Sequence, residues 1–250
     1  MKRVLLPLLC SAFCSGAIAQ VAGDTVVTAG GAWLNFANSS SGNLVSSSPF
    51  GTFASNGTNS EIHNALTEGI FITRYFTDNI AVEGALAFPP KLNMYAQGNA
   101  APLGAGGPNM PLGSLQPLAS ARTWPAMALL KYAFGRPDAS FRPFLGLGVN
   151  YTWYSGIELN PAFYQAAQAF AGSGGSVQSS LHDSWNPVFT AGFTYRMAER
   201  WYAMGTLMYI PLKTDAEIRS TAANGQTVMT NRIHINADPV IAFVGVGYRF

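Results

Sequence analysis

Apolar and polar side chains alternate along much of the chain, most clearly between residues 80 and 88. One face of this segment carries Ile80, Val82, Leu86 and Phe88, and the opposite face carries Ala81, Glu83, Ala85 and Ala87. A period of two residues predicts a β-strand whose two faces meet different surroundings. A strand of about nine residues at about 3.3 Å each, tilted by about 45°, would cover roughly the apolar thickness of a bilayer.

The same period recurs in eight segments, residues 25–36, 61–76, 80–88, 123–134, 141–154, 181–196, 201–212 and 232–250. The connections between them are alternately short and long. The short ones are residues 77–79, 135–140 and 197–200, and the long ones are residues 37–60, 89–122, 155–180 and 213–231. All connections at one end of an up-and-down barrel are alike. The pattern therefore predicts an all-β fold, an eight-stranded antiparallel up-and-down transmembrane β-barrel with short periplasmic turns and four long extracellular loops.

The expected outer face distinguishes two kinds of barrel. A soluble eight-stranded barrel of the lipocalin type would place polar residues there, whereas a membrane barrel places apolar ones. The outward candidates are Ile80, Val82, Leu86, Leu145, Leu147, Val149, Phe189, Phe193, Leu207, Val244 and Val246. Aromatic residues near the strand ends, such as Trp124, Trp185 and Trp201, fit the girdles at the two membrane surfaces. We therefore expect the outer face to contact lipid.

Residues 1–19 have the order of a cleaved signal peptide, in which basic residues precede an apolar stretch and small residues such as Ala17 and Ala19. The expected cut lies before Gln20. The apolar stretch is shorter than the roughly 20 residues that a spanning helix needs. We therefore expect residues 1–19 to be removed and residues 20–250 to form a single outer-membrane barrel domain.

The composition excludes several kinds of chemistry. Both cysteines, Cys10 and Cys14, fall in the expected signal peptide, so disulfide, thiolate–zinc and cysteine-nucleophile chemistry are excluded from the mature chain. Without Lys2 and Arg3, the number of basic residues falls from 14 to 12, which equals the number of acidic residues. No basic stripe for nucleic acid therefore remains. Charged residues make up 10% of the chain, against about 25% in an ordinary soluble domain.

The last strand ends on aromatic residues, in the sequence Tyr248-Arg-Phe250. This ending resembles the closing strand of bacterial outer-membrane barrels, in which it is read by the barrel-assembly machinery. Tyr248 and Phe250 are therefore the expected assembly signal. The expected location is the cell outer membrane of a Gram-negative bacterium.

Several motifs resemble those of the OmpW family of small outer-membrane barrels. They are Thr77-Asp-Asn-Ile-Ala-Val-Glu83, Lys131-Tyr-Ala-Phe-Gly135, Phe141-Arg-Pro-Phe-Leu-Gly-Leu-Gly-Val-Asn-Tyr151, Asp183-Ser-Trp185 and Gly247-Tyr-Arg-Phe250. The resemblance implies a narrow apolar interior, uptake of small hydrophobic molecules and lateral release into the membrane; some relatives also serve as bacteriocin or phage receptors. Ala85 and Met208 occupy positions at which relatives carry a larger apolar constriction.

The inward faces of the predicted strands are unusually apolar, because porin lumens are polar. We expect an apolar passage formed by Ala85, Ala87, Met127, Leu129, Met204, Met208, Ile241 and Phe243. Flexible methionine side chains suit a passage of adaptable shape.

Charged residues gather near the predicted periplasmic turns. We expect a charged plug in the lower half of the lumen, formed by Arg74, Glu83, Lys131, Arg142, Arg196 and Arg249. Glu83 would be the single carboxylate among basic neighbours. The alternative role of these residues is to pack an otherwise hollow small barrel.

A hydrophobic ligand would meet desolvated charge at such a plug and would have to leave sideways. An exit through the wall needs a weakened hydrogen-bond ladder. Pro125, Pro187, Pro211 and Pro239 each remove a backbone donor in the outer half of a strand. The alternative is that these prolines only mark strand ends or bulges.

Residues 160–172 predict a short helix in the third outer loop. Asn160 is a capping residue, Pro161 stands at the first helical position and Gly172 terminates the pattern. The helix would shield the mouth of the passage or present an apolar docking face, or it would simply pack against its own loop.

No set of residues predicts catalysis or a bound metal. His63, His182 and His234 lack the spacing of metal ligands. His182 and Asp183 suggest a hydrolase, in which a carboxylate orients a histidine that acts as general base. Neighbours in a strand point to opposite faces, however, so these two residues cannot act together without a bulge. We expect no enzymatic activity and no cofactor.

The sequence favours a passive outer-membrane channel for small hydrophobic molecules. Its expected partners are outer-membrane lipid, the hydrophobic ligands and the barrel-assembly machinery, with no nucleic acid and an oligomeric state that the sequence leaves open. The alternative is a structural, adhesive or receptor barrel that acts through its extracellular loops.

Overall fold

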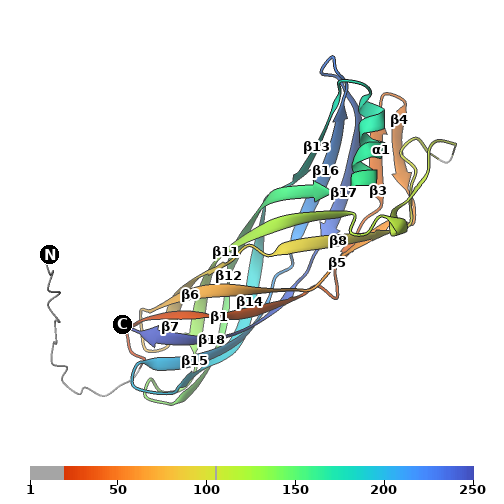
Figure 1. The fold of residues 1–250 in the computed structure, drawn as a ribbon. Coiled ribbons are helices and arrows are strands. Elements are labelled where there is room, and N and C mark those ends of the chain that lie inside the picture. Colours follow the sequence, from red (N-terminus) through yellow and green to blue (C-terminus); the bar gives the residue numbers. More distant parts are fainter. Residues whose placement is uncertain (1–19, 105) are drawn as a thin grey trace, which may run out of the picture.

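The computed structural model describes residues 20–104 and 106–250 (Figure 1). The predicted signal peptide, residues 1–19, lies outside the described residues. Within them, eight antiparallel strands close into a barrel. They are β1 (Thr25–Asn35), β6 (Ala65–Tyr75), β7 (Ile80–Ala87), β11 (Ala119–Ala133), β12 (Phe141–Leu159), β14 (Ser184–Arg196), β15 (Trp201–Tyr209) and β18 (Val240–Arg249). Each pairs with the next, and β1 closes the circle by pairing with β18. The predicted up-and-down barrel is confirmed.

The short turns and the carboxyl terminus lie at one end of the barrel, called the periplasmic end below (Figure 1). The backbone N–H of Gln20 donates to the carbonyl of Pro137 in one short turn, at 3.2 Å. The backbone N–H of Phe250 donates to the Thr25 carbonyl at 2.9 Å, which fastens the last residue to the first strand. The opposite end is called the extracellular end.

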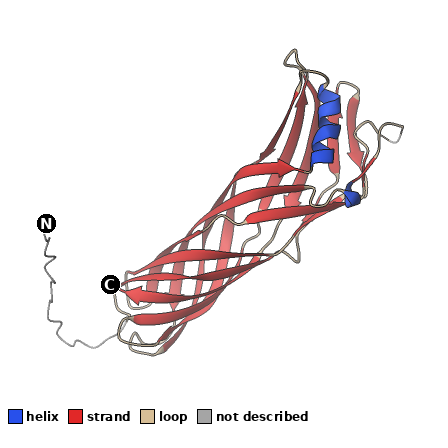
Figure 2. Ribbon diagram, viewed as in Figure 1, coloured by secondary structure: helices blue, strands red, loops and turns tan. Residues whose placement is uncertain are grey.

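The long connections lie at the extracellular end and contain strands of their own, which were not predicted from the sequence. They are β2 (Ser40–Ser41), β3 (Leu44–Ser48), β4 (Gly51–Ser55), β5 (Asn59–Ile62), β8 (Lys91–Gln97), β9 (Asn99–Ala100), β10 (Met110–Pro111), β13 (Ser176–Leu181), β16 (Lys213–Thr221) and β17 (Thr227–Asn236). β8 and β5 continue the barrel wall beyond β7, and β13, β16, β17, β3 and β4 form a second sheet. Figure 2 shows these strands extending the molecule well beyond the barrel at the extracellular end.

The predicted single strand over residues 232–250 is wrong, because it is broken into β17 and β18. Asp238 between them has a positive φ of 39°, which few non-glycine residues adopt. Pro239 follows and has no backbone donor. The break turns the chain from the second sheet back into the barrel wall.

The predicted helix is present as α1 (Pro161–Ala171). The Asn160 side chain accepts a hydrogen bond from the backbone N–H of Ala162, and Gly172 ends the helix with a φ of 75°. Phe163 and Ala167 are buried against the second sheet. The helix lies beside β13, β16 and β17 (Figure 1). Among the described residues no helix is long and apolar enough to cross a membrane.

The predicted parity of the strands is confirmed. All eleven outward candidates are exposed large hydrophobic side chains, with Leu147 at 62% and Val244 at 71%. Two belts of aromatic side chains border this apolar band. Trp124 stacks on Trp153 at the extracellular side, with ring centroids 5.9 Å apart, and Trp201 packs edge-on against Tyr248 at the periplasmic side. Such belts are typical of barrels in a membrane.

Candidate functional site

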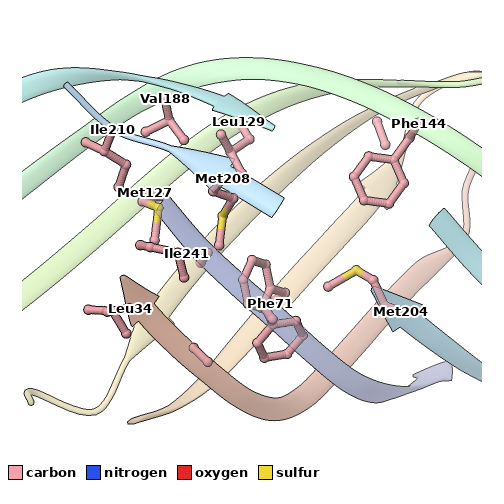
Figure 3. Packing of buried hydrophobic residues seen from close by; sticks show 14 of the residues in the cluster. Leu34, Phe71, Met127, Leu129, Phe144, Val188, Met204, Met208, Ile210 and Ile241 are labelled. Carbon is pink, nitrogen blue, oxygen red and sulfur yellow. The ribbon is translucent and has the colours of Figure 1, made fainter. Parts of the chain in front are cut away.

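An apolar layer crosses the middle of the barrel (Figure 3). The rings of Phe71 on β6 and Phe243 on β18 meet there with centroids 4.4 Å apart. Ala85 on β7 is the register partner of both Phe71 and Met127, and its small side chain leaves room between the larger neighbours. Met208 is the register partner of Ile241. These side chains are all buried, so the layer fills the bore with hydrocarbon.

The predicted passage residues lie inside the barrel. Ala85, Met127, Leu129, Met204, Met208, Ile241 and Phe243 are buried, and Ala87 is half-buried at the end of β7. Sequence reasoning missed Phe71, Val188 and Ile210, which belong to the same buried cluster. Parity could have found Phe71, because its neighbours Ile70 and Ile72 face outward.

Above this layer, at the extracellular end, residues of the barrel and of the second sheet line an apolar cavity of about 130 Å³. Its lining includes Leu34, Leu92, Leu212 and Ile235, with Ile241 at the end nearest the layer. Phe163 of α1 and Leu112 also line it, so the helix takes part in covering the mouth. A cavity of about 150 Å³ in another protein is large enough to bind benzene. The cavity therefore has the size of a small ring compound.

Polar residues also occur in the lining of the cavity, and two of them, Asn150 and Thr123, carry buried polar atoms without a hydrogen-bond partner among the described residues. Asn150 is fully buried, and its amide nitrogen donates to the Thr152 hydroxyl at 2.6 Å. Its side-chain oxygen and the hydroxyl of Thr123 have no hydrogen-bond partner among the described residues. Both residues line the cavity. A buried polar group without a partner is costly, so a ligand group that reached one of these atoms and formed a hydrogen bond with it would relieve that cost.

Below the apolar layer, Glu83 and Lys131 form a buried ion pair with a Glu83 oxygen 2.8 Å from Lys131 Nζ. The same oxygen accepts a hydrogen bond from the Thr73 hydroxyl at 2.6 Å. Lys131 Nζ lies 3.5 Å from the centre of the Phe144 ring, which adds a cation–π contact. The charges of both side chains therefore have partners that offset the cost of removing them from water.

Arg142 occupies a second buried cluster nearer the periplasmic end. It is 1% exposed, and its guanidinium donates to the backbone carbonyls of Gln20 and Asp78. The guanidinium also lies 5.8 Å from the centre of the Tyr75 ring. Sequence reasoning missed Gln20 because it stands at the very start of the expected mature chain.

The remaining predicted plug residues are placed differently. Arg249 lies inward at the rim, where its guanidinium is 3.3 Å from Asp24, so Glu83 is not the single carboxylate of the cluster. Arg196 is half-buried and donates to the Asp138 carbonyl in a turn. Arg74 is a wrong prediction, because it is exposed on the outer face and donates to Thr25. Its neighbours Thr73 and Tyr75 face inward, and parity turns Arg74 outward.

The barrel wall has a break between β14 and β15. Their ladder ends at the pair Phe189 and Tyr209, although β14 continues to Ser184. Continuing this register by two residues places Pro187 opposite Pro211, and neither has a backbone donor. The Lys213 N–H there donates to the Asn186 side chain instead of to a backbone carbonyl. Pro125 lies within the intact β11–β12 ladder, and Pro239 lies outside the strands.

The histidines form no catalytic or metal-binding arrangement that the described residues reveal. His182 and Asp183 lie between β13 and β14; the Asp183 carboxylate accepts from the Tyr151 hydroxyl at 2.9 Å. His234 contacts Asp215 at 2.7 Å on the exposed face of the second sheet. No group of three or more His, Cys, Asp or Glu side chains that could hold a metal ion occurs among residues 20–104 and 106–250.

Known proteins resemble this chain over most of its length. It is 27% identical to Outer membrane protein W of Vibrio cholerae serotype O1 over 182 residues, which cover 73% of this chain and 72% of that protein. It is 25% identical to Outer membrane protein W of Escherichia coli strain K12 over 252 residues, which cover 100% and 99%.

Solved structures share the fold. The crystal structure of the outer membrane protein OprG from Pseudomonas aeruginosa superposes with a TM-score of 0.73 at 24% identity, covering 94% of this chain and 99% of that one. The structure of outer membrane protein AlkL in lipid bilayers gives a TM-score of 0.59 at 20% identity, covering 96% of each chain. The OmpW family model matches residues 21–250. The chain therefore belongs to the OmpW family and is an outer-membrane protein of a Gram-negative bacterium.

Proposed function

We propose that the protein is a passive channel for small hydrophobic molecules. The observation that carries this proposal is the apolar cavity at the extracellular end, which leads to the layer of Met127, Met208 and Phe243. Porin lumens are polar and hold water, whereas an apolar lining favours ligands that gain free energy on leaving water. Flexible methionine side chains at the end of the cavity can move to let a ligand pass.

The cavity also indicates the kind of ligand. A volume of about 130 Å³ suits a body the size of a single ring. The unpartnered oxygen of Asn150 can accept one hydrogen bond from a hydroxyl group on such a ligand. A phenol would therefore use the Asn150 oxygen, whereas toluene would not. In Asn150→Leu we expect phenol uptake to fall relative to toluene uptake, and an unchanged ratio would exclude this role for Asn150.

The charged residues below the apolar layer direct the ligand sideways. Moving a hydrophobic molecule past Glu83, Lys131 and Arg142 would disturb buried charges and their hydrogen bonds, which costs several kcal/mol. The break between β14 and β15 lies beside the cavity, because Ile210 and Leu212 line the cavity at that point. We place the lateral exit there.

Uptake measurements test the channel. Cells with the protein should take up radiolabelled toluene faster than cells without it, and Met208→Arg should remove the difference because it places a charge in the apolar layer. The matched control is Met197→Arg, the same change at an exposed periplasmic turn. Folding of both variants is checked by the heat-dependent gel mobility of the barrel. Equal uptake with and without the protein would refute the proposal.

An engineered disulfide tests the exit. The mature chain is expected to hold no cysteine, so Pro187→Cys with Pro211→Cys introduces one pair across the break. Oxidation should stop uptake and a reductant should restore it, with cross-linking followed by mass spectrometry. The control pair, Ala191→Cys and Leu207→Cys, joins register partners in the intact ladder. Full uptake by cells that carry the cross-linked protein would place the exit elsewhere.

One observation favours the alternative, a receptor or adhesive barrel. The second sheet and α1 form an ordered surface beyond the barrel (Figure 2), and Phe50 at the turn between β3 and β4 is 83% exposed. An exposed aromatic ring at a tip is a typical contact residue. Loss of cell-surface binding in Phe50→Ser, with toluene uptake unchanged, would support this alternative.

A further inference from the structure

Gln20 is buried at the periplasmic end as the first residue that the structure describes. Its side chain is 2% exposed. The side-chain oxygen accepts hydrogen bonds from the Tyr75 hydroxyl at 3.2 Å and the Thr194 hydroxyl at 3.4 Å, and Arg142 Nη1 lies 3.5 Å away. The backbone carbonyl accepts from Arg142 at 3.2 Å, and the backbone N–H donates to Pro137. The site therefore recognises two carbonyl oxygens and one N–H.

The side-chain amide nitrogen of Gln20 is the atom that this site does not use. Nε2 is buried and has no hydrogen-bond partner among the described residues. An amide N–H without a partner in such a position is destabilising. The surroundings thus suit a residue with the carbonyl of glutamine but without its NH₂ group.

The charge at this position leads to the same conclusion. Cleavage before Gln20 would leave an α-ammonium group on it, beside the buried guanidinium of Arg142. The contacts of that guanidinium are with neutral groups, namely the carbonyls of Gln20 and Asp78 and the ring of Tyr75. A second cation would be desolvated there and repelled by Arg142, although the carboxylates of Asp24 and Asp78 accept from the backbone N–H groups of Val21 and Ala22.

We propose that the mature chain begins with pyroglutamate at position 20. The uncharged α-amine attacks Cδ of its own side chain; the N–Cδ bond forms, the Cδ–Nε2 bond breaks, and Nε2 leaves as ammonia with the proton that the amine gives up. No oxidant or reductant takes part. The lactam keeps one N–H for Pro137 and one ring carbonyl for Tyr75 and Arg142. It lacks both the α-ammonium charge and the unpartnered Nε2.

The proposal rests on the predicted cut and does not depend on the transport function. The test is the intact mass of the full-length gene product, expressed with its own signal peptide in a Gram-negative host and purified at once from the outer membrane. We expect the mass of residues 20–250 less one ammonia. The matched control is Gln20→Asn, which keeps an amide but would need a strained four-membered ring, and its mass should be that of the linear chain.

Three results would overturn the proposal. They are the full mass of linear residues 20–250, an amino terminus at another residue, and ammonia loss that appears only when the purified protein is stored. Thermal unfolding in detergent gives an independent readout. Gln20→Asn keeps the α-ammonium beside Arg142 and should unfold at a lower temperature than the wild-type protein, whereas an equal temperature would contradict the electrostatic argument.

Discussion

Lys131 Nζ lies 2.8 Å from a Glu83 carboxylate oxygen inside the barrel, and the two side chains are 5% and 2% exposed. They come from the adjacent strands β11 and β7, and Thr73 on β6 donates to the same oxygen. A buried ion pair gains stability only when both charges are fully compensated, and removing one partner leaves the other charge buried and unpaired.

We therefore predict that Glu83→Gln and Lys131→Met each lower the free energy of unfolding by about 3–5 kcal/mol. The double variant should lose less than the sum of the two, because it leaves no unpaired charge. Urea unfolding of the folded barrel in lipid vesicles measures both effects. Asp138→Asn breaks the exposed pair with Arg136 and serves as the control, with no measurable change expected. If the double variant lost as much free energy of unfolding as the two single variants together, Glu83 and Lys131 would not be coupled.

Phe243→Ala removes one of the two rings that meet in the apolar layer. We expect the free energy of unfolding to fall by about 3–5 kcal/mol, because a large buried ring is lost. We also expect toluene uptake to rise, because the bore is wider at this layer. Phe193→Ala removes an outward ring within the intact β14–β15 ladder and should leave uptake unchanged. A folded Phe243→Ala barrel with wild-type uptake would show that the layer does not limit passage.

The second sheet should weaken in acid. The hydrogen bond from Arg232, at 2.8 Å, together with that from Arg219, holds the pKa of the Glu217 carboxyl below its ordinary value, although burial opposes this shift. Because the pKa is lower in the folded state, the stabilisation is complete above the ordinary glutamate pKa of about 4.3 and is lost as pH falls through the folded-state pKa.

Hydrogen exchange of peptides from β16 and β17 measures this effect. After correction for intrinsic rates, protection should fall below about pH 4 in the wild-type protein. In Glu217→Gln the pH dependence should disappear, because the group no longer titrates. Glu199→Gln, at a periplasmic turn, should keep the wild-type profile. Constant protection of the wild-type sheet down to the pH at which the barrel itself unfolds would contradict the prediction.

Phe250 contributes little to the folded barrel, because its side chain is 72% exposed and contacts Tyr248 with ring centroids 5.0 Å apart. If the terminal aromatic is an assembly signal, Phe250→Ser should reduce the amount of folded protein in the outer membrane while leaving its unfolding in vitro unchanged. Phe76→Ser, at another exposed ring near a periplasmic turn, is the control. Equal amounts of wild-type protein and Phe250→Ser in the membrane would exclude the signal.

Alternation predicted which residues face inward wherever it was followed through a whole strand. Val82 faces outward and Glu83 faces inward, as their polarity indicates. The error at Arg74 arose because nearness to a turn was used in place of parity. The missed strands of the second sheet have another cause. Segments such as β3 and β4 are short and rich in small polar residues, whereas β16 and β17 are longer and pair over nine positions.

The sequence by itself determined the barrel, its eight strands, the inward and outward faces of those strands and the location in a membrane, because each depends on local periodicity that repeats along the chain. Only the tertiary structure decided which side chains meet inside. Gln20 meets Tyr75, Arg142 and Thr194, and the β14–β15 ladder ends at Phe189 and Tyr209, through the register of paired strands. Register is set by hydrogen bonding between segments far apart in the chain, and no local pattern carries that information.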